Sequence, residues 1–271
     1  MKLIPFAIFF ITATQFPLLA QAQTAQQTQQ TQQTQQTQQS ASRQVSASRR
    51  PVFRWAKKPP RLSTIPGRGV GMGSRDDCPA VKTPLIALAP FKQAGTKSLE
   101  VGGLTTAERP TFWFYLPYSK DFANVSAEFV LQDSEENDVY KNAIALPKTA
   151  GVVGVPLPST VAPLEVGKTY RWFFKVYCTK EAGSPPINVE GDIQRVTLEA
   201  NEESQLAAAK DPREKISIYA ASGIWFDSLT LLTKLRFQNP NDTSLAADWQ
   251  SLLQSIGLEN IVNASLVTTE R

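Results

Sequence analysis

Apolar and polar residues alternate with a period of two through the central part of the chain, between Pro84 and Leu198. This period places successive side chains on opposite faces of an extended strand. It is regular over residues 169–178, where the even positions are apolar or aromatic and Arg171 and Lys175 carry charge. Such runs, separated by Pro, Gly and Asn turns, predict strands over residues 85–88, 112–116, 126–132, 139–146, 152–157, 169–178 and 187–198.

The strand over residues 112–116 belongs to the densest aromatic run of the chain. Phe112 and Phe114 fall on one of its faces, and Trp113 and Tyr115 fall on the other. Large rings on both faces predict a central strand that is covered on both sides. We therefore expect the rest of the chain to pair with this strand, pack on it or tether it.

After Glu199 the apolar period changes to about 3.6 residues, which is typical of α-helices. Asp211 and Pro212 form a helix start, with an N-cap followed by a first-turn proline. That helix is expected to end at Gly223, where the chain needs a turn. Further helices are predicted to open at residues 201–203, to run from about 225 to before 239, and to run from about 244 to 256.

Strands followed by helices predict an α+β protein. We expect an antiparallel, immunoglobulin-like β-sandwich over residues 78–199, followed by a helical region over residues 200–271. A helical hairpin in this region resembles a partial tetratricopeptide repeat, whose characteristic positions are filled by Gly223, Trp225, Ser228, Leu232, Leu235 and Pro240. A peptide-binding solenoid needs about three repeats, so a hairpin that caps the sandwich is the favoured interpretation.

Residues 1–22 have the pattern of a secretory signal peptide, with a charged start at Lys2, a mostly apolar run and an Ala-Gln-Ala cleavage site. An uncleaved membrane anchor is the less favoured alternative, because polar residues interrupt the run. Residues 23–42 form a Thr/Gln-rich spacer, whose composition predicts disorder, with self-association as the alternative. We therefore expect the mature protein in the periplasm or attached to the cell envelope.

Residues 43–77 form a basic arm. Residues 43–75 hold nine basic residues and no acidic one, whereas residues 76–271 hold all 24 acidic residues and 18 basic ones. Such an arm suits an anionic envelope polymer or a peripheral contact with lipid headgroups, and nucleic acid is not expected outside the cell. A solvated tether, or an arm docked on the acidic folded part, is the favoured alternative. The arm residues singled out for binding are Arg49, Arg50, Arg54, Lys57 and Lys58.

The chain contains two cysteines, Cys78 and Cys178, and no histidine. In an oxidising compartment this even count predicts a disulfide, with two separate buried thiols as the alternative. The lack of histidine removes Ser-His and Cys-His nucleophile pairs and His-based metal sites. We predict no metal and no cofactor.

Two groups of acidic residues are candidates for chemistry. Glu190 and Asp192 lie two apart on a predicted strand and project from one face, as an acid–base pair in glycoside hydrolysis would require. Solvated outward positions are the favoured explanation of this spacing. Residues 133–138 are rich in possible calcium ligands but lack the EF-hand spacing and its glycine, so a hairpin loop is favoured there.

Two further segments flank the predicted strands. Glu108 and Arg109 precede the aromatic strand, where they form either an ion pair at the sheet edge or, with Trp113 and Tyr115, a possible binding surface. The alternating glycines of residues 66–78 follow no predicted strand and precede no helix. They therefore predict a flexible hinge and not a phosphate-binding loop.

Together these segments resemble a family of exported cyanobacterial proteins catalogued as domain of unknown function 928. The matching stretches are residues 103–118 (GLTTAERPTFWFYLPY), 127–133, 163–172, 189–191 and 245–249. The resemblance covers about residues 65–262 and leaves out the Thr-Gln-Gln tract. Because the family has no established activity, the resemblance implies export and the extent of the domain, but no catalytic residue.

Three hypotheses for function follow. The favoured one is a non-enzymatic binding module of the cell envelope, whose partner is an envelope protein or an anionic envelope polymer. The second is a glycan hydrolase that uses Glu190 and Asp192. The third is a structural subunit that assembles with its own copies through a strand edge or the helical hairpin.

Overall fold

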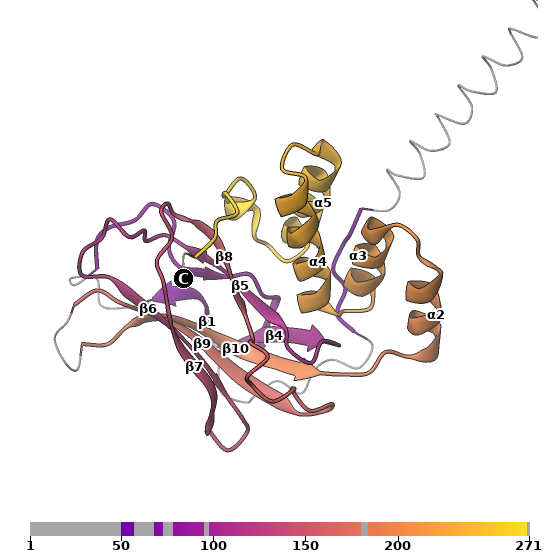
Figure 1. The fold of residues 1–271 in the computed structure, drawn as a ribbon, viewed down its shortest axis with the longest axis horizontal. Coiled ribbons are helices and arrows are strands. Elements are labelled where there is room, and N and C mark those ends of the chain that lie inside the picture. Colours follow the sequence, from indigo (N-terminus) through magenta and orange to yellow (C-terminus); the bar gives the residue numbers. More distant parts are fainter. Residues whose placement is uncertain (1–49, 57–67, 73–77, 95–97, 180–183, 270–271) are drawn as a thin grey trace, which may run out of the picture. The chain divides into compact units, whose positions relative to one another are not determined.

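The computed structural model describes residues 50–56, 68–72, 78–94, 98–179 and 184–269 (Figure 1). The predicted signal peptide, the Thr/Gln-rich spacer and the arm residues Arg49, Lys57 and Lys58 lie outside these ranges. Within the described ranges, every helix is too short or too polar to cross a bilayer.

The strands form two sheets that β1 connects. One sheet has the order β7-β6-β9-β10, and the other has the order β2-β5-β8; β1 pairs with β10 on one side and with β2 on the other. The β3–β4 hairpin adds to β10. The strands are β1 (Arg68–Met72), β2 (Ile86–Ala87), β3 (Phe91–Ala94), β4 (Ser98–Thr105), β5 (Thr111–Leu116), β6 (Ser126–Gln132), β7 (Asp138–Ile144), β8 (Gly151–Pro156), β9 (Thr169–Tyr177) and β10 (Ile187–Arg195).

The α+β class and the seven predicted strands are confirmed, but the pairing differs from the prediction in two ways. β4 runs parallel to β10, with Asp192 opposite Gly102, so the sheet is mixed and not wholly antiparallel. β1 also lies inside the stretch that was predicted to be a hinge. Backbone pairing with β10 and β2 makes it a strand, because the neighbouring strands satisfy its N–H and C=O groups whatever its side chains are.

The aromatic strand β5 is covered on both faces, as predicted. On one face, the ring of Phe114 lies 4.5 Å from that of Phe174 on the opposing sheet, between ring centroids. On the other face, Trp113 donates its indole N–H to the hydroxyl of Thr230 on α4 over 3.0 Å. The backbone of Gly154 on β8 makes room for the indole, since a Cβ there would lie 2.7 Å from the Trp113 ring.

The helices follow the last strand and form a layer beside the strands (Figure 1). The N-cap Asp211 accepts the N–H of Arg213 over 2.9 Å, and Gly223 has the left-handed backbone (φ 79°) that ends α3, as predicted. The buried carboxylate of Asp248 accepts two bonds from Arg213, of 2.6 and 3.0 Å, and so ties α5 to α3. The bounds are α2 (Ala200–Ala208), α3 (Pro212–Ala221), α4 (Trp225–Gln238), α5 (Thr243–Gln254) and the short η1 (Glu259–Ile261).

The segment after η1 returns to the strands. The N–H of Val152 donates to the carbonyl of Ser265 over 2.8 Å, and the N–H of Val267 donates to the carbonyl of Val152 over 2.9 Å. These bonds cover the edge of β8 that does not face β5. The contact is close, because a Cβ on Gly151 would lie 2.5 Å from the carbonyl oxygen of Ser265.

The predicted disulfide is present between Cys78 and Cys178, whose Cα atoms lie 4.9 Å apart and 100 residues apart in the sequence. It joins the segment before β2 to the residue after β9. The segment that leads into β2 of the second sheet is thereby fixed to the end of β9 in the first sheet.

Candidate functional site

Residues 50–56 of the predicted arm run as an extended ribbon alongside the helices (Figure 1). Phe53 is only 7% exposed, and its ring meets that of Trp225 edge-on at 5.3 Å. The N–H of Phe53 donates to the hydroxyl of Ser255, and the N–H of Arg54 donates to the carbonyl of Ala220, both over 3.0 Å. The buried ring of Phe53 and two backbone hydrogen bonds, together with the half-buried Trp55, therefore dock this segment on the folded part.

For these residues, the structure supports an arm that is docked on the folded part. The contacts are made by the backbone and by the apolar side chains of Pro51, Phe53 and Trp55, whereas the side chains of Arg50 and Arg54 are exposed. The docking is thus apolar and not the charge pairing that the arm's composition suggested. It also needs a glycine, because a Cβ on Gly223 would lie 2.5 Å from the backbone nitrogen of Ala56.

A groove of about 710 Å³ opens beside the docked segment. Arg54, Trp55 and Ala56 of the segment line it together with residues of α2, α3 and the loop before α2. Its apolar lining includes Leu104, Val196, Leu198, Ile218 and Ile224, and its polar lining includes Glu199, Asn201, Glu202 and Gln205. Mixed linings of this kind, with apolar surface and a few placed polar groups, are typical of ligand sites.

A second cleft, of about 270 Å³, lies where the β4–β5 connection meets α3 and α4. At its base, Asp227 in the first turn of α4 accepts hydrogen bonds from the hydroxyl of Thr105 (2.7 Å) and from the N–H (3.2 Å) and hydroxyl of Thr106. Burial raises the pKa of Asp227, and these hydrogen bonds oppose that rise only in part. Thr105 and Thr106 therefore hold the start of α4 against the β4–β5 connection through the half-buried carboxylate of Asp227.

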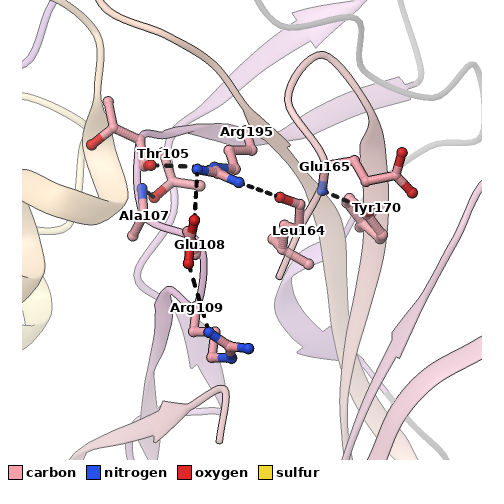
Figure 2. A network of polar contacts seen from close by, with 9 residues as sticks. Thr105, Ala107, Glu108, Arg109, Leu164, Glu165, Tyr170 and Arg195 are labelled. Atoms are coloured by element: carbon pink, nitrogen blue, oxygen red, sulfur yellow. Dashed lines mark hydrogen bonds and ion pairs between the residues drawn. The ribbon is translucent and has the colours of Figure 1, made fainter. Parts of the chain in front are cut away.

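The same connection carries the ion pair predicted at the sheet edge (Figure 2). The carboxylate of Glu108 lies 3.7 Å from the Arg109 guanidinium and 3.4 Å from that of Arg195. Arg195 also donates to the carbonyl of Leu164 over 2.7 Å, and Arg109 donates to that of Val161 over 2.9 Å. The network fastens residues 161–165 to the start of β5.

The predicted binding surface is smaller than the sequence suggested. Trp113 is only 9% exposed and lies beneath α4, so its ring serves helix packing. Tyr115 is half-buried and sits in the sheet opposite Ile86 and Val152. Of the four residues, only Glu108 and Arg109 offer charged groups to solvent.

Glu190 and Asp192 do share one face of β10, but they are not solvated as expected. Asp192 is only 3% exposed. Both carboxylates face Arg171 on β9, at 3.0 Å for Glu190 and 3.6 Å for Asp192. All three side chains line a cleft of about 430 Å³. Sharing one guanidinium explains their spacing as an ion-pair network across two strands.

Residues 133–137, which are rich in acidic side chains, form the predicted hairpin loop between β6 and β7. The carboxylate of Asp133 accepts the N–H groups of Glu135 and Asn137, both over 2.9 Å. Hydrogen bonds from Asn137 lower the pKa of Asp133. The oxygen atoms of this residue therefore stabilise the turn. Among the residues that the structure describes, no group of three or more His, Cys, Asp or Glu side chains is placed to hold a metal ion.

A family model described as Domain of Unknown Function (DUF928) matches residues 70–266 of the chain. These residues include nearly all of both sheets and the four α-helices of the described part of the chain. No curated protein matches the chain.

Proposed function

Because the chain belongs to this family, which has no assigned function, we propose from the structure that the protein is a non-enzymatic binding module for an extended polypeptide. The ligand occupies the groove beside residues 50–56 and belongs to another protein of the cell envelope. The observation that carries this proposal is that the helical layer already holds one extended polypeptide, namely residues 50–56 of its own chain.

The helical layer supports this proposal by its geometry. The α3–α4 hairpin resembles part of a tetratricopeptide repeat, an architecture whose helix pairs present extended concave binding surfaces. A single hairpin is too small to hold a long peptide alone. Here the docked segment and the loop before α2 supply the missing walls of the groove. The two β-sheets then serve as the rigid support of the site.

The chemistry of the groove suits a polypeptide. Leu198 and Ile218 are half-buried and offer apolar surface to alternate side chains of an extended ligand. Glu202 and Gln205 on α2 offer acceptors and a donor to backbone groups that would otherwise lose their hydrogen bonds to water. The groove thus meets both requirements of an extended peptide, which must bury side chains and keep its backbone bonded.

Export is part of the proposal. It is supported by the signal-peptide pattern of residues 1–22 and by the Cys78–Cys178 disulfide, since disulfides persist mainly in oxidising compartments. The partner is therefore sought among proteins of the envelope.

Site-specific photocrosslinking in intact cells of the native host tests the proposal. A photoreactive amino acid replaces Gln205, which is exposed and lines the groove. The matched control replaces Ala207, which is exposed on the same helix but does not line the groove. We expect a discrete polypeptide adduct from position 205 and none from position 207. An isolated peptide from the adduct should then block crosslinking of the purified protein.

Equal adducts from both positions would contradict the proposal, because the contact would then be non-specific. So would the absence of a polypeptide adduct from position 205 in cells that export the protein. Glycan turnover by the purified protein that is lost when Glu190→Gln and Asp192→Asn are combined would favour the hydrolase hypothesis instead.

A further inference from the structure

The cleft between the β4–β5 connection and α4 carries a second, independent inference. Asp227 lines it together with two cationic side chains, Arg109 and Lys234, which belong to different elements. Arg109 belongs to the connection before β5, and Lys234 lies on α4, two turns beyond Asp227. We propose that this cleft binds a small anionic group, a carboxylate or a phosphate, between Arg109 and Lys234.

A hydrogen bond holds the side chain of Arg109 in place and leaves other N–H donors of its guanidinium available. Its Nε donates to the carbonyl of Val161 over 2.9 Å, which fixes the plane of the group. Its only ion pair among the described residues is with Glu108 at 3.7 Å, longer than the roughly 2.7–2.9 Å of a charge-assisted hydrogen bond. The Nη groups therefore retain donors for an oxyanion, which Arg binds with two parallel bonds.

The charges around the cleft favour an anion. Glu108 is shared by Arg109 and Arg195, so one carboxylate faces two guanidinium groups. Lys234 is exposed and forms no ion pair with any residue that the structure describes. Asp227 also lines the cleft, but its oxygen atoms are occupied by Thr105 and Thr106. Arg109, Arg195 and Lys234 thus face the two carboxylates of Glu108 and Asp227, which leaves one positive charge in excess around the cleft.

Size and the remaining polar groups define the ligand class. The volume of about 270 Å³ lies just below the range of about 300–1,000 Å³ that is usual for drug-sized ligands. It therefore suits one small unit or the end of a polymer. Hydroxyl groups of Thr111, Tyr219 and Thr230 also line the cleft. These hydroxyl groups would form hydrogen bonds, as donors or as acceptors, with the hydroxyls of a sugar acid or a sugar phosphate.

The NMR signal of the Trp113 indole N–H reports on this cleft. The chain has five tryptophans, and the N–H of Trp113 bonds to Thr230, which lines the cleft. Inorganic phosphate and glucuronate are titrated separately into ¹⁵N-labelled mature protein at low salt, with glucose as the neutral control. We expect a saturable shift of the Trp113 indole signal with at least one anion and none with glucose. The indole of Trp249, which bonds to the carbonyl of Val262, should stay fixed.

Two lysine variants decide whether the effect comes from the proposed site. Lys234→Gln removes a rim charge, and we expect the affinity to fall about tenfold or more, because one charge-assisted bond is lost. Lys210→Gln removes an exposed charge between α2 and α3 and should leave the affinity unchanged. Unaltered melting temperatures establish that both variants fold.

A response to phosphate alone, or to glucuronate alone, supports the proposal and identifies the anion. The absence of a Trp113 shift with either anion would overturn the proposal. An equal loss of affinity in both lysine variants would overturn it as well, since the binding would then reflect net charge only.

Discussion

Replacing Gly223 by alanine should release the docked segment from the helices. Gly223 and Gly257 both follow a helix and both have a left-handed backbone, with φ of 79° and 78°. Alanine in that conformation costs about 1–2 kcal/mol at either site. The sites differ in their surroundings. A Cβ on Gly257 would touch only Phe91, at an ordinary 3.6 Å, whereas a Cβ on Gly223 would lie 2.5 Å from the nitrogen of Ala56.

The additional loss of stability in Gly223→Ala arises because Ala56 must move away from the new Cβ. A shift of Ala56 moves the whole segment, which exposes the buried ring of Phe53 and breaks the backbone hydrogen bonds of Phe53 and Arg54. Burial of the ring is worth about 1.5–3 kcal/mol, and each bond about 0.5–1.5 kcal/mol. Released residues regain conformational entropy, which offsets part of the loss. We therefore expect Gly223→Ala to lose about 1–3 kcal/mol more than Gly257→Ala.

Two measurements on the mature protein test this reasoning. Urea denaturation gives the free energy of unfolding of the wild type and of both variants. Limited trypsin digestion, followed by mass spectrometry, gives the rate of cleavage after Arg54, whose backbone N–H is bonded to Ala220. We expect faster cleavage only in Gly223→Ala. Equal losses of stability in the two variants, with unchanged protection of Arg54, would refute the role of this contact.

Three further predictions concern stability. Asp248→Ala should lower the free energy of unfolding, measured in urea, by about 3–5 kcal/mol, because it leaves the Arg213 charge without its buried partner. The control Asp242→Ala removes only the N-cap of α5 and should lower it by about 1 kcal/mol. Equal losses in the two variants would contradict this prediction. Burial raises the pKa of Asp227, so the folded state binds more protons than the unfolded state between the ordinary and the raised pKa. The stability of the wild type relative to Asp227→Asn should therefore fall as the pH rises through that window. A stability difference that does not depend on pH would contradict the raised pKa of Asp227. Cys78→Ser should lower the free energy of unfolding by up to about 4.7 kcal/mol, and dithiothreitol should then destabilise the wild type but not the variant.

Features fixed by local chemistry were predictable from the sequence. The N-cap at Asp211, the first-turn proline Pro212 and the turn at Gly223 each act within a few residues, so the bounds of α3 follow from them. The two faces of β5 were predictable for the same reason. A strand must send neighbouring side chains to opposite sides, and rings as large as Phe114 and Trp113 need cover on both.

Features that depend on distant partners were not predictable. In the sequence, Asp227 is an ordinary helix residue. Its role depends on Thr105, which lies 122 positions earlier in the chain and donates a hydrogen bond to its carboxylate. The burial of Asp192 likewise depends on the register that sets it opposite Arg171. β4 joins the sheet through a parallel pairing with β10, and its glycines hide the alternation that would mark it as a strand. Each of these is a consequence of tertiary pairing, which one sequence does not reveal.

The segment that covers β8 has a consequence for the order of events during synthesis. Val152 and Gly151 are made long before Ser265 and Val267, yet their free edge is closed only by those late residues. Until then a nascent chain holds a valine-rich strand with unpaired backbone groups, which is open to wrong pairing. We therefore expect a chain truncated before residue 264 to misfold at the exposed edge of β8, although the truncation lies after all the described helices. In this fold, residues 265–267 complete the second sheet, although they follow β8 by more than 100 positions.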